Sequence, residues 1–395
     1  MNNTAKSEKI VVGILKESLC LGGTERSAAN ISKLLEQSFG LHFIIFNGSD
    51  IKYTYGGNLI DIKAPPKKSL LGKFVNSFIR YLRVKKAMKH NKIDIIYEFI
   101  TIENMLSYVS YKDTKRIISA RDFGKIQRNT EGFHKALSKA NAMICNSEYI
   151  KNYYLSKYPE HKDKVFTVYN VIDGDEIARQ AVEEPEKGYL DFIKAHSKTI
   201  SVVGRFCKEK GFEFMLEAFA KATEDIDLGL VMIGDGDYKE RYTSVIERLG
   251  IKEKVYFTGF QNNPYKYMAR SDIFVLSSLS EGFPNVLAEA MSMGLPVIAA
   301  NCYSGPAEIL RNDSDYQAVT DSFKPCDYGI ITPRITENDN KNAVLELSKA
   351  IEYLARNEEI AKEYSLLSKK RAMAFSPDNA SMELNKIFEI LSKKG

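Results

Sequence analysis

The stretch EGFPNVLAEAMSMGLPVIA, residues 281–299, combines the signals of a turn, a helix and a strand. The apolar run at 272–278 before it has the length and residue types of a buried strand. Gly282 permits a sharp turn, residues 285–293 have the pattern of a helix, and residues 295–300 form another apolar strand. Strand, loop, helix and strand in this order are the building block of a parallel sheet. The stretch therefore predicts an α/β fold.

Two glutamates, Glu281 and Glu289, stand eight positions apart around the start of this helix. Glu281 is expected on the loop at the carboxyl end of a strand, where open α/β sheets bind ligands. The unbonded backbone N–H groups of Phe283, Asn285 and Val286 open the helix beside it and suit a phosphate. A ligand with hydroxyls for the carboxylates and phosphate for the helix end fits this pattern, and a nucleotide-sugar has both.

Length and composition indicate an ordinary globular protein. With 395 residues, 44% of them hydrophobic and 27% charged, two domains are expected. No apolar run approaches the roughly 18 residues of a transmembrane helix, and the first residues lead straight into a strand, unlike a signal peptide. Five cysteines without a close pair favour a reducing compartment over a disulfide or zinc framework. The expected location is the cytoplasm.

Two blocks of the sequence show the same alternation of strands and helices. Strands are expected near 10–15, 42–46, 93–99, 116–119, 142–145 and 165–168, and near 199–204, 228–233, 255–258, 272–277 and 296–300. The fold class is therefore α/β, with two Rossmann-like, doubly wound parallel-sheet domains facing each other across a cleft. The expected domains are 1–174 and 198–375, with a linker at 175–197 and a C-terminal helix at 376–395 that crosses back to the first domain.

Glycines and cations follow the first strand of each block. In the second block, Gly204, Arg205 and Lys210 stand on the loop after the strand, where the two cations can hold a diphosphate from two sides. The alternative is that both are solvated loop charges. In the first block, Gly22 and Gly23 precede a helix and can let phosphate approach backbone N–H groups, although the GxGxxG pattern is absent.

The sequence predicts no metal and no cofactor. Residues 173–175 and 235–237 both read Asp-Gly-Asp, but Asp-Gly is foremost a turn signal, and a hard cation needs more oxygen ligands than one pair supplies. Four histidines are scattered without paired spacing for a metal: His90, His134, His161 and His196.

Residues 67–92 contain nine Lys or Arg and no acidic residue. Five apolar residues fall on one face of a helix: Leu71, Phe74, Phe78, Tyr81 and Leu82. Two interpretations remain open, a basic amphipathic helix on an anionic membrane surface, or a domain helix whose apolar face is core. Nucleic-acid binding is not expected, because no aromatic and basic recognition motif is present.

Four pieces in order, "GGTER", "VGRFCKEKG", "IGDGD" and "SEGFPNVLAEAMSMGLPVIA", resemble the retaining nucleotide-sugar glycosyltransferases with the GT-B fold, family 4. The resemblance covers nearly the whole chain. It implies that Arg205 and Lys210 hold the donor diphosphate and stabilise the leaving group, and that Glu281 and Glu289 accept hydrogen bonds from the donor sugar and the ribose. Arg205, Lys210 and Glu281 are the implied catalytic residues. Further donor contacts are implied at Gly22, Gly23, Gly204, Phe260, Gly282, Phe283, Asn285 and Val286.

One position departs from the family pattern. Many members carry a histidine at the end of a first-domain strand, close to the reacting sugar, and the corresponding stretch here ends in Arg121 and Asp122. These two residues are the expected acceptor-side contacts.

The resemblance implies a retaining, metal-independent transfer of a sugar from a nucleotide-sugar to a glycan or lipid-linked acceptor in the assembly of capsule, lipopolysaccharide or a similar polymer. UDP is the expected nucleotide and GDP the alternative. The departing phosphate is expected to take the acceptor's proton, so no general base is assigned. A non-catalytic GT-B binding subunit and a sugar-nucleotide epimerase are the alternative functions. The location is the inner face of the plasma membrane if residues 67–92 contact lipid.

Overall fold

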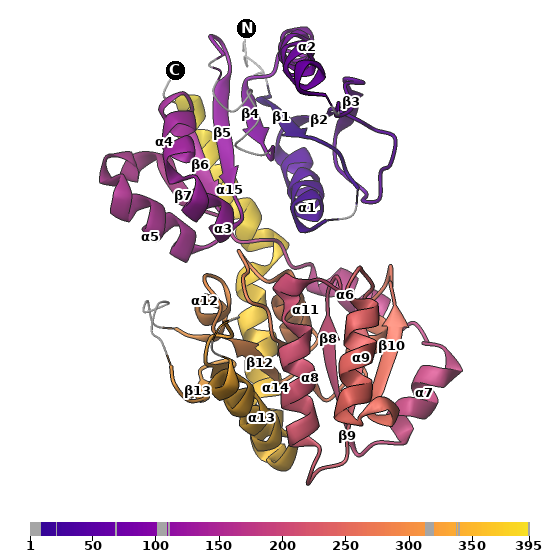
Figure 1. Cartoon of the computed structure of the whole chain (residues 1–395). Helices are drawn as coiled ribbons and strands as arrows, with labels where there is room; N and C mark the ends of the chain where they lie inside the picture. Colours follow the sequence, from indigo (N-terminus) through magenta and orange to yellow (C-terminus); the bar gives the residue numbers. More distant parts are fainter. Residues whose placement is uncertain are drawn as a thin grey trace, which may run out of the picture. The chain divides into compact units, whose positions relative to one another are not determined.

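The computed structural model describes residues 9–20, 22–67, 69–100, 109, 111–312, 320–336, 338 and 340–393. The chain divides into two units, one formed by Met1–Val171 with Pro377–Gly395 and the other by Ile172–Ser376 (Figure 1). Each unit is built on a mainly parallel sheet with helices between its strands. This confirms the predicted fold class of two parallel-sheet α/β domains.

The first unit has a parallel sheet whose described strands run in the order β3-β2-β1-β4-β5-β6-β7. These strands are β1 (Val11–Lys16), β2 (Gly40–Ile45), β3 (Asn58–Asp61), β4 (Ile95–Glu98), β5 (Lys115–Ala120), β6 (Ala142–Cys145) and β7 (Val165–Thr167). The helices are α1 (Gly23–Ser38), α2 (Leu70–His90), α3 (Phe123–Arg128), α4 (Thr130–Ser138), α5 (Glu148–Lys157), the 3₁₀ helix η2 (Pro159–Lys164) and α15 (Pro377–Lys393).

Successive side chains of β1 enter two different cores, because strand side chains alternate between the faces of a sheet. Val12 and Ile14 belong to a core that also contains residues of α1 and α15. Leu15 belongs to another core, which includes Val84 and Met88 of α2. Helices therefore cover both faces of this sheet, which is why its central strands are mostly apolar.

The second unit has a sheet in the order β10-β9-β8-β11-β12-β14-β13, parallel except for β13 against β14. Its strands are β8 (Lys198–Val203), β9 (Leu228–Ile233), β10 (Val255–Gly259), β11 (Ile273–Leu276), β12 (Val297–Ala300), β13 (Lys324–Cys326) and β14 (Gly329–Thr332). The helices are α6 (Gly174–Ala181), α7 (Lys187–Lys194), α8 (Phe212–Ala222), α9 (Lys239–Leu249), α10 (Tyr265–Met268), α11 (Asn285–Ser292), α12 (Pro306–Leu310), α13 (Lys341–Arg356) and α14 (Glu358–Ala372), with the 3₁₀ turns η3 (Lys208–Lys210), η4 (Lys252–Lys254) and η5 (Met373–Phe375). Across the described helices of both units, none has the length and apolar composition that spanning a bilayer requires.

The structure corrects the predicted linker at 175–197. This segment forms α6 and α7 and belongs to the second unit. The buried Tyr189 of α7 donates its hydroxyl hydrogen to Tyr267 O at 2.7 Å, and Asn263 Nδ2 donates to Gln180 O of α6 at 2.8 Å. Short amphipathic helices with many charged residues resemble a linker in composition. Their few buried side chains contact residues that are far away in the sequence.

The structure also contains three strands that the sequence analysis missed. β3 and β13 are edge strands, and β14 is a four-residue strand beside an edge. No residue of β3 or β13 is fully buried, so neither gives the apolar run by which a buried strand is recognised.

The C-terminal helix α15 packs in the first unit, where Leu384 and Phe388 are buried.

A buried ion pair joins β4 and β5. Arg116 Nε and Nη2 donate to the two carboxylate oxygens of Glu98 at 2.9 and 3.0 Å, and both side chains are 1% exposed. Arg116 Nη1 also donates to Val109 O at 3.0 Å. Burial raises the pKa of Glu98, and the charge of Arg116 only partly opposes this. Glu98 therefore depends on the positive charge of Arg116 to offset the cost of burying its carboxylate.

We expect Arg116→Met to lower the free energy of unfolding by about 3–5 kcal/mol, because it leaves the buried Glu98 without its cation. Urea unfolding followed by circular dichroism measures this loss. The control is Lys386→Met, which removes an exposed ion pair with Glu383 and should cost less than about 1 kcal/mol. Equal losses in the two variants would contradict the assigned role of the buried pair.

Candidate functional site

Two loops of the second unit meet at one edge of its sheet. β8 and β11 are neighbouring parallel strands, so the loops that follow them leave the sheet at the same edge. Lys210 closes η3 after β8, and Glu281 lies on the loop between β11 and α11. Lys210 Nζ lies 2.7 Å from Glu281 Oε1. The structure thus brings together two of the three predicted catalytic residues.

Hydrogen bonds from the β11 loop hold this pair in place. Ser278 Oγ donates to Glu281 Oε1 at 2.7 Å, and Ser277 Oγ donates to Lys210 O at 3.0 Å. The backbone N–H of Leu279 donates to Glu209 O at 2.8 Å. Both loops are therefore fastened by main-chain and hydroxyl contacts as well as by the ion pair.

Gly211 permits this close approach of the loops. Its φ of +63° lies in the left-handed region, and a Cβ at this position would lie 2.2 Å from Ser277 O. Any larger residue would push the two loops apart, because its Cβ would overlap the backbone of the loop after β11. The glycine of the "KEKG" motif is thus explained by packing between loops.

Glu281 favours the charged form of Lys210. Burial by itself lowers the pKa of Lys210, but the charge of Glu281 and its hydrogen bond outweigh that effect, so the pKa lies above its ordinary value. The side chains are 24% and 14% exposed. The arrangement presents a protonated lysine and a carboxylate together at a surface that solvent still reaches.

The start of α11 lies beside this pair and is fixed by a third loop. Ser304 Oγ donates to Gly282 O at 2.7 Å. A Cβ at Gly305 would lie 2.4 Å from Cδ of Pro284, so this loop packs directly on the turn before α11. Phe283 is buried and its ring contacts Phe375 with centroids 5.1 Å apart. The first N–H groups of α11, at Asn285 and Val286, are therefore held in a defined place.

The other predicted donor residues of the second unit have different environments. Glu289 lies within α11 and is 2% exposed. Phe260 follows β10 and is 54% exposed. Gly204 packs against the aliphatic part of Lys210, and the exposed Arg205 makes no hydrogen bond or ion pair within the described residues. The structure joins Lys210 and Glu281 directly and leaves Arg205 exposed on the loop that leads to Lys210.

The predicted glycines of the first unit lie at the start of α1. Gly22 is the N-cap of α1, and its N–H donates to the Tyr53 hydroxyl at 3.3 Å. A Cβ at Gly23 would meet no atom within 4 Å, so the space beside the helix start is open. This placement is compatible with the predicted approach of phosphate, which stays a prediction.

Arg121 and Asp122 follow β5, and both make contacts within the first unit. Arg121 Nη1 donates to Ser27 Oγ at 2.8 Å and to Asn170 Oδ1 at 2.6 Å, and Nη2 donates to the Tyr97 hydroxyl at 2.9 Å. Asp122 caps α3 by accepting from Lys125 N at 2.9 Å. Arg121 therefore ties together α1, β4 and the segment after β7. The role of Arg121 and Asp122 as acceptor contacts stays a prediction.

The sequence analysis missed a charged cluster at the end of β1. Lys16 is 5% exposed, and its Nζ lies 2.6 Å from Glu17 Oε2 and 3.1 Å from Glu25 Oε1. Burial lowers the pKa of Lys16, but the two glutamates outweigh this and raise it. A lysine that ends an apolar strand is the signal by which the cluster could have been found. Ser278, the second residue after β11, is a polar side chain at a strand end and gives a similar signal.

The two Asp-Gly-Asp segments act in turns and caps. Asp173 caps α6 by accepting from Glu176 N at 3.0 Å. Asp235 Oδ1 accepts from Gly236 N at 2.8 Å, and Asp235 O accepts from Phe206 N at 2.8 Å. Neither segment belongs to a cluster of potential metal ligands in the described part of the chain.

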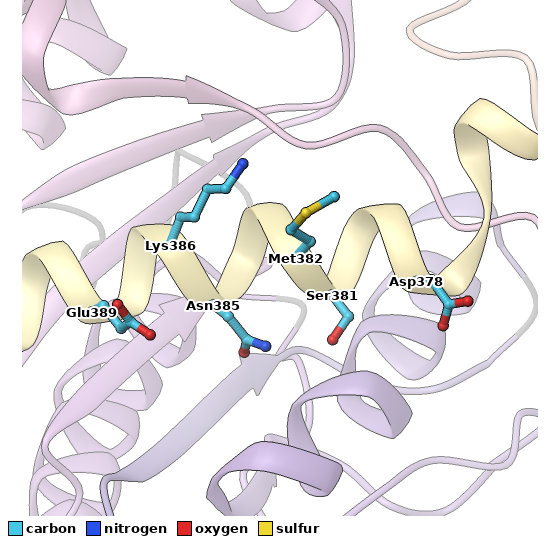
Figure 2. A pocket seen from close by; sticks show the side chains of 6 residues that line it. All are labelled: Asp378, Ser381, Met382, Asn385, Lys386 and Glu389. Carbon is cyan, nitrogen blue, oxygen red and sulfur yellow. The ribbon is translucent and has the colours of Figure 1, made fainter.

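A surface hollow of about 440 Å³ lies elsewhere, along α15. Figure 2 shows its lining side chains, which all come from this one helix: Asp378, Ser381, Met382, Asn385, Lys386 and Glu389. None of them is a predicted site residue, and the hollow offers no cluster of converging groups from different elements. We therefore place the candidate site at the Lys210 and Glu281 pair.

Two family models match the chain. The model described as Glycosyltransferase Family 4 matches residues 21–176, and the model described as Glycosyl transferases group 1 matches residues 191–325. The second match includes the Lys210 and Glu281 pair.

Curated relatives and solved structures agree with these models. The chain is 26% identical over 379 residues, 92% of its length and 95% of the relative's, to N-acetylgalactosamine-N,N'-diacetylbacillosaminyl-diphospho-undecaprenol 4-alpha-N-acetylgalactosaminyltransferase of Campylobacter jejuni. It is 26% identical to the amylovoran biosynthesis glycosyltransferase AmsD of Erwinia amylovora, covering 75% of this chain and 83% of the relative. The crystal structure of Anabaena HepE in complex with UDP has a TM-score of 0.71 at 16% identity, covering 96% and 99% of the two chains.

We expect Glu281→Gln to lower the pKa of Lys210, because burial then acts on the ammonium without an opposing carboxylate. Lys210 should therefore react with acetic anhydride at lower pH than in the wild type, as measured by peptide mass spectrometry. Glu213→Gln is the control, since Glu213 pairs with Arg241 and not with Lys210. An unchanged labelling profile in Glu281→Gln would show that Glu281 does not set the charge of Lys210.

Proposed function

Because the chain is a GT-B glycosyltransferase of family 4 type, we propose that it transfers a sugar, with retention of anomeric configuration, from a UDP-sugar to a glycan or lipid-linked acceptor. The observation that carries this proposal is the Lys210 and Glu281 pair at the carboxyl edge of the second sheet. The setting is the assembly of a surface polysaccharide or glycoconjugate, as the names of the Campylobacter and Erwinia relatives suggest.

Lys210 would stabilise the leaving diphosphate. An ammonium has three N–H donors, and Lys210 uses one of them on Glu281, so two others can bind phosphate oxygens. Arg205 can add a second cation from the same loop, since none of its donors is engaged within the described residues. Negative charge grows on the diphosphate as the bond to the sugar breaks, and fixed cations at that position lower the barrier. Protein cations in this place are also the reason for proposing a metal-independent reaction.

Glu281 would orient the donor sugar. Its Oε1 already accepts from Lys210 and Ser278, and a carboxylate has further acceptor positions for sugar hydroxyls. Glu289 would accept from the ribose, and the first N–H groups of α11 would bind phosphate. The departing phosphate would take the acceptor's proton as the acceptor oxygen bonds to the anomeric carbon. UDP as the nucleotide is supported by the HepE complex.

A donor screen tests the proposal. We expect one UDP-sugar to raise the melting temperature in the presence of EDTA, because a ligand that binds only the folded state stabilises it by mass action. Lys210→Ala should lower turnover by roughly 10²–10³-fold, since it removes a donor to the developing charge. Lys208→Ala, an exposed lysine on the same turn, is the control. Normal turnover in Lys210→Ala, or turnover only with added metal, would contradict the proposal.

The alternative functions give different results in the same assay. An epimerase would convert the donor without any acceptor. A non-catalytic binding subunit would show no consumption of any UDP-, GDP- or ADP-sugar, with or without Mg²⁺.

The helix α2 would hold the protein against an anionic membrane. Tyr81, Val84 and Met88 face the interior, but a second set of apolar residues is exposed, namely Leu71 (76%), Phe74 (65%), Val75 (48%), Phe78 (57%) and Leu82 (48%). Their spacing of i, i+3, i+4, i+7 and i+11 puts them on one side of the helix. Exposed lysines at 73, 85, 86 and 89 accompany them, as in helices that lie in a lipid interface. A membrane position suits an enzyme that uses a lipid-linked acceptor.

We expect Phe74→Ser combined with Phe78→Ser to weaken binding to vesicles containing phosphatidylglycerol, because two exposed aromatic rings no longer enter the lipid. Vesicle co-sedimentation measures this. Leu366→Ser with Met373→Ser is the matched control, since both residues are at least 70% exposed but lie outside α2. Equal binding by the two double variants would contradict the membrane role of α2.

A further inference from the structure

Two histidines that are far apart in the sequence meet in the first unit, which corrects the prediction that they are scattered. His134 lies in α4 and His161 in η2, and the distance between His134 Nδ1 and His161 Nε2 is 3.1 Å. Glu160 Oε1 lies 3.9 Å from His134 Nδ1. The three ligand atoms lie within 4.8 Å of one another, and no other such group of His, Cys, Asp and Glu occurs among the described residues.

Aromatic packing fixes the two imidazoles. The ring of His134 stacks on Tyr158, with centroids 4.1 Å apart and planes at 13°. His161 is 9% exposed, and its backbone N–H donates to Tyr158 O at 3.2 Å. The buried Tyr154 lies against both Tyr158 and His161. Glu160 is 56% exposed in its side chain, so the carboxylate can adjust to a third partner.

The spacing of these nitrogens matches a metal chelate. Two imidazole nitrogens at the usual zinc distance of about 2.0–2.1 Å, in tetrahedral geometry, lie roughly 3.3 Å apart. A small rotation of either ring would bring the observed separation of 3.1 Å to this value. Metals bind the neutral form of imidazole. Two imidazoles with one carboxylate form a donor set that suits Zn²⁺ and similar borderline metals.

We propose that His134, Glu160 and His161 bind one Zn²⁺ or a similar divalent transition metal and thereby fasten α4 to η2. The fourth position would be taken by water, since the Glu160 side faces solvent. η2 ends at the residue before β7, so this site lies toward the amino end of a strand, whereas Arg121 follows the carboxyl end of β5. The metal would accordingly stabilise the first unit and take no part in sugar transfer.

Zinc titration of the EDTA-treated full chain tests the proposal. Calorimetry should show one equivalent of Zn²⁺ bound, and the melting temperature should rise with Zn²⁺ and not with Mg²⁺, because Mg²⁺ prefers oxygen ligands. His134→Gln combined with His161→Gln should lose this binding step and this shift. His90→Gln, an exposed histidine of α2, should keep both. Melting temperatures without metal show whether each variant is folded.

Two outcomes would overturn the proposal. Absence of stoichiometric binding to the wild type would mean that the histidines share only a hydrogen bond. Unchanged binding in the double variant would place the metal elsewhere, for example at the partly exposed Cys20, Cys207 or Cys326. Nitrogen-15 spectra of the five histidines give an independent readout, since Zn²⁺ should shift two imidazoles and leave the other three in place.

Discussion

The parallel pairing of β8 with β11 is the constraint on which the candidate site depends. Lys210 and Glu281 are 71 residues apart, and they meet because their loops leave neighbouring strands at the same edge. In an antiparallel pair the two loops would leave opposite edges. The left-handed conformation of Gly211 then allows contact between the loops, with no side chain between its backbone and Ser277. The chemistry of the site is thus a consequence of strand order and direction.

Charged side chains in both units gather at strand ends and are compensated there. Lys16 ends β1 beside two glutamates, and Lys210 follows β8 beside one. Burial lowers the pKa of each lysine, and in both cases the carboxylates reverse that effect. Glu98 and Arg116 lie inside the sheet and neutralise each other's charge. The partly exposed Lys210 pair can exchange partners with a ligand, whereas the fully buried pair serves the fold.

Central strands and motif loops could be predicted, but edges and connections could not. β9 and β11 are built of buried residues without a charged side chain, because both faces of a parallel sheet are covered, and such runs can be recognised in the sequence. β3 and β13 lack such runs, since an edge strand is only partly covered. The helices α6 and α7 have the composition of a linker because each contains only one buried residue, Ile177 and Tyr189. The hydrophobic pattern of a strand or helix is weak wherever few of its side chains are buried.

The sequence by itself determined the α/β class, the presence of two domains and the identity of the motif residues Lys210 and Glu281, because these depend on local periodicity, on turn residues and on motifs in a fixed order. Only the tertiary structure decided which charged groups meet. It paired Lys210 with Glu281, engaged Arg121 with Ser27 and Asn170, and brought His134 to His161. Contacts between side chains far apart in the sequence depend on strand order and helix packing, and neither leaves a local signal along the chain.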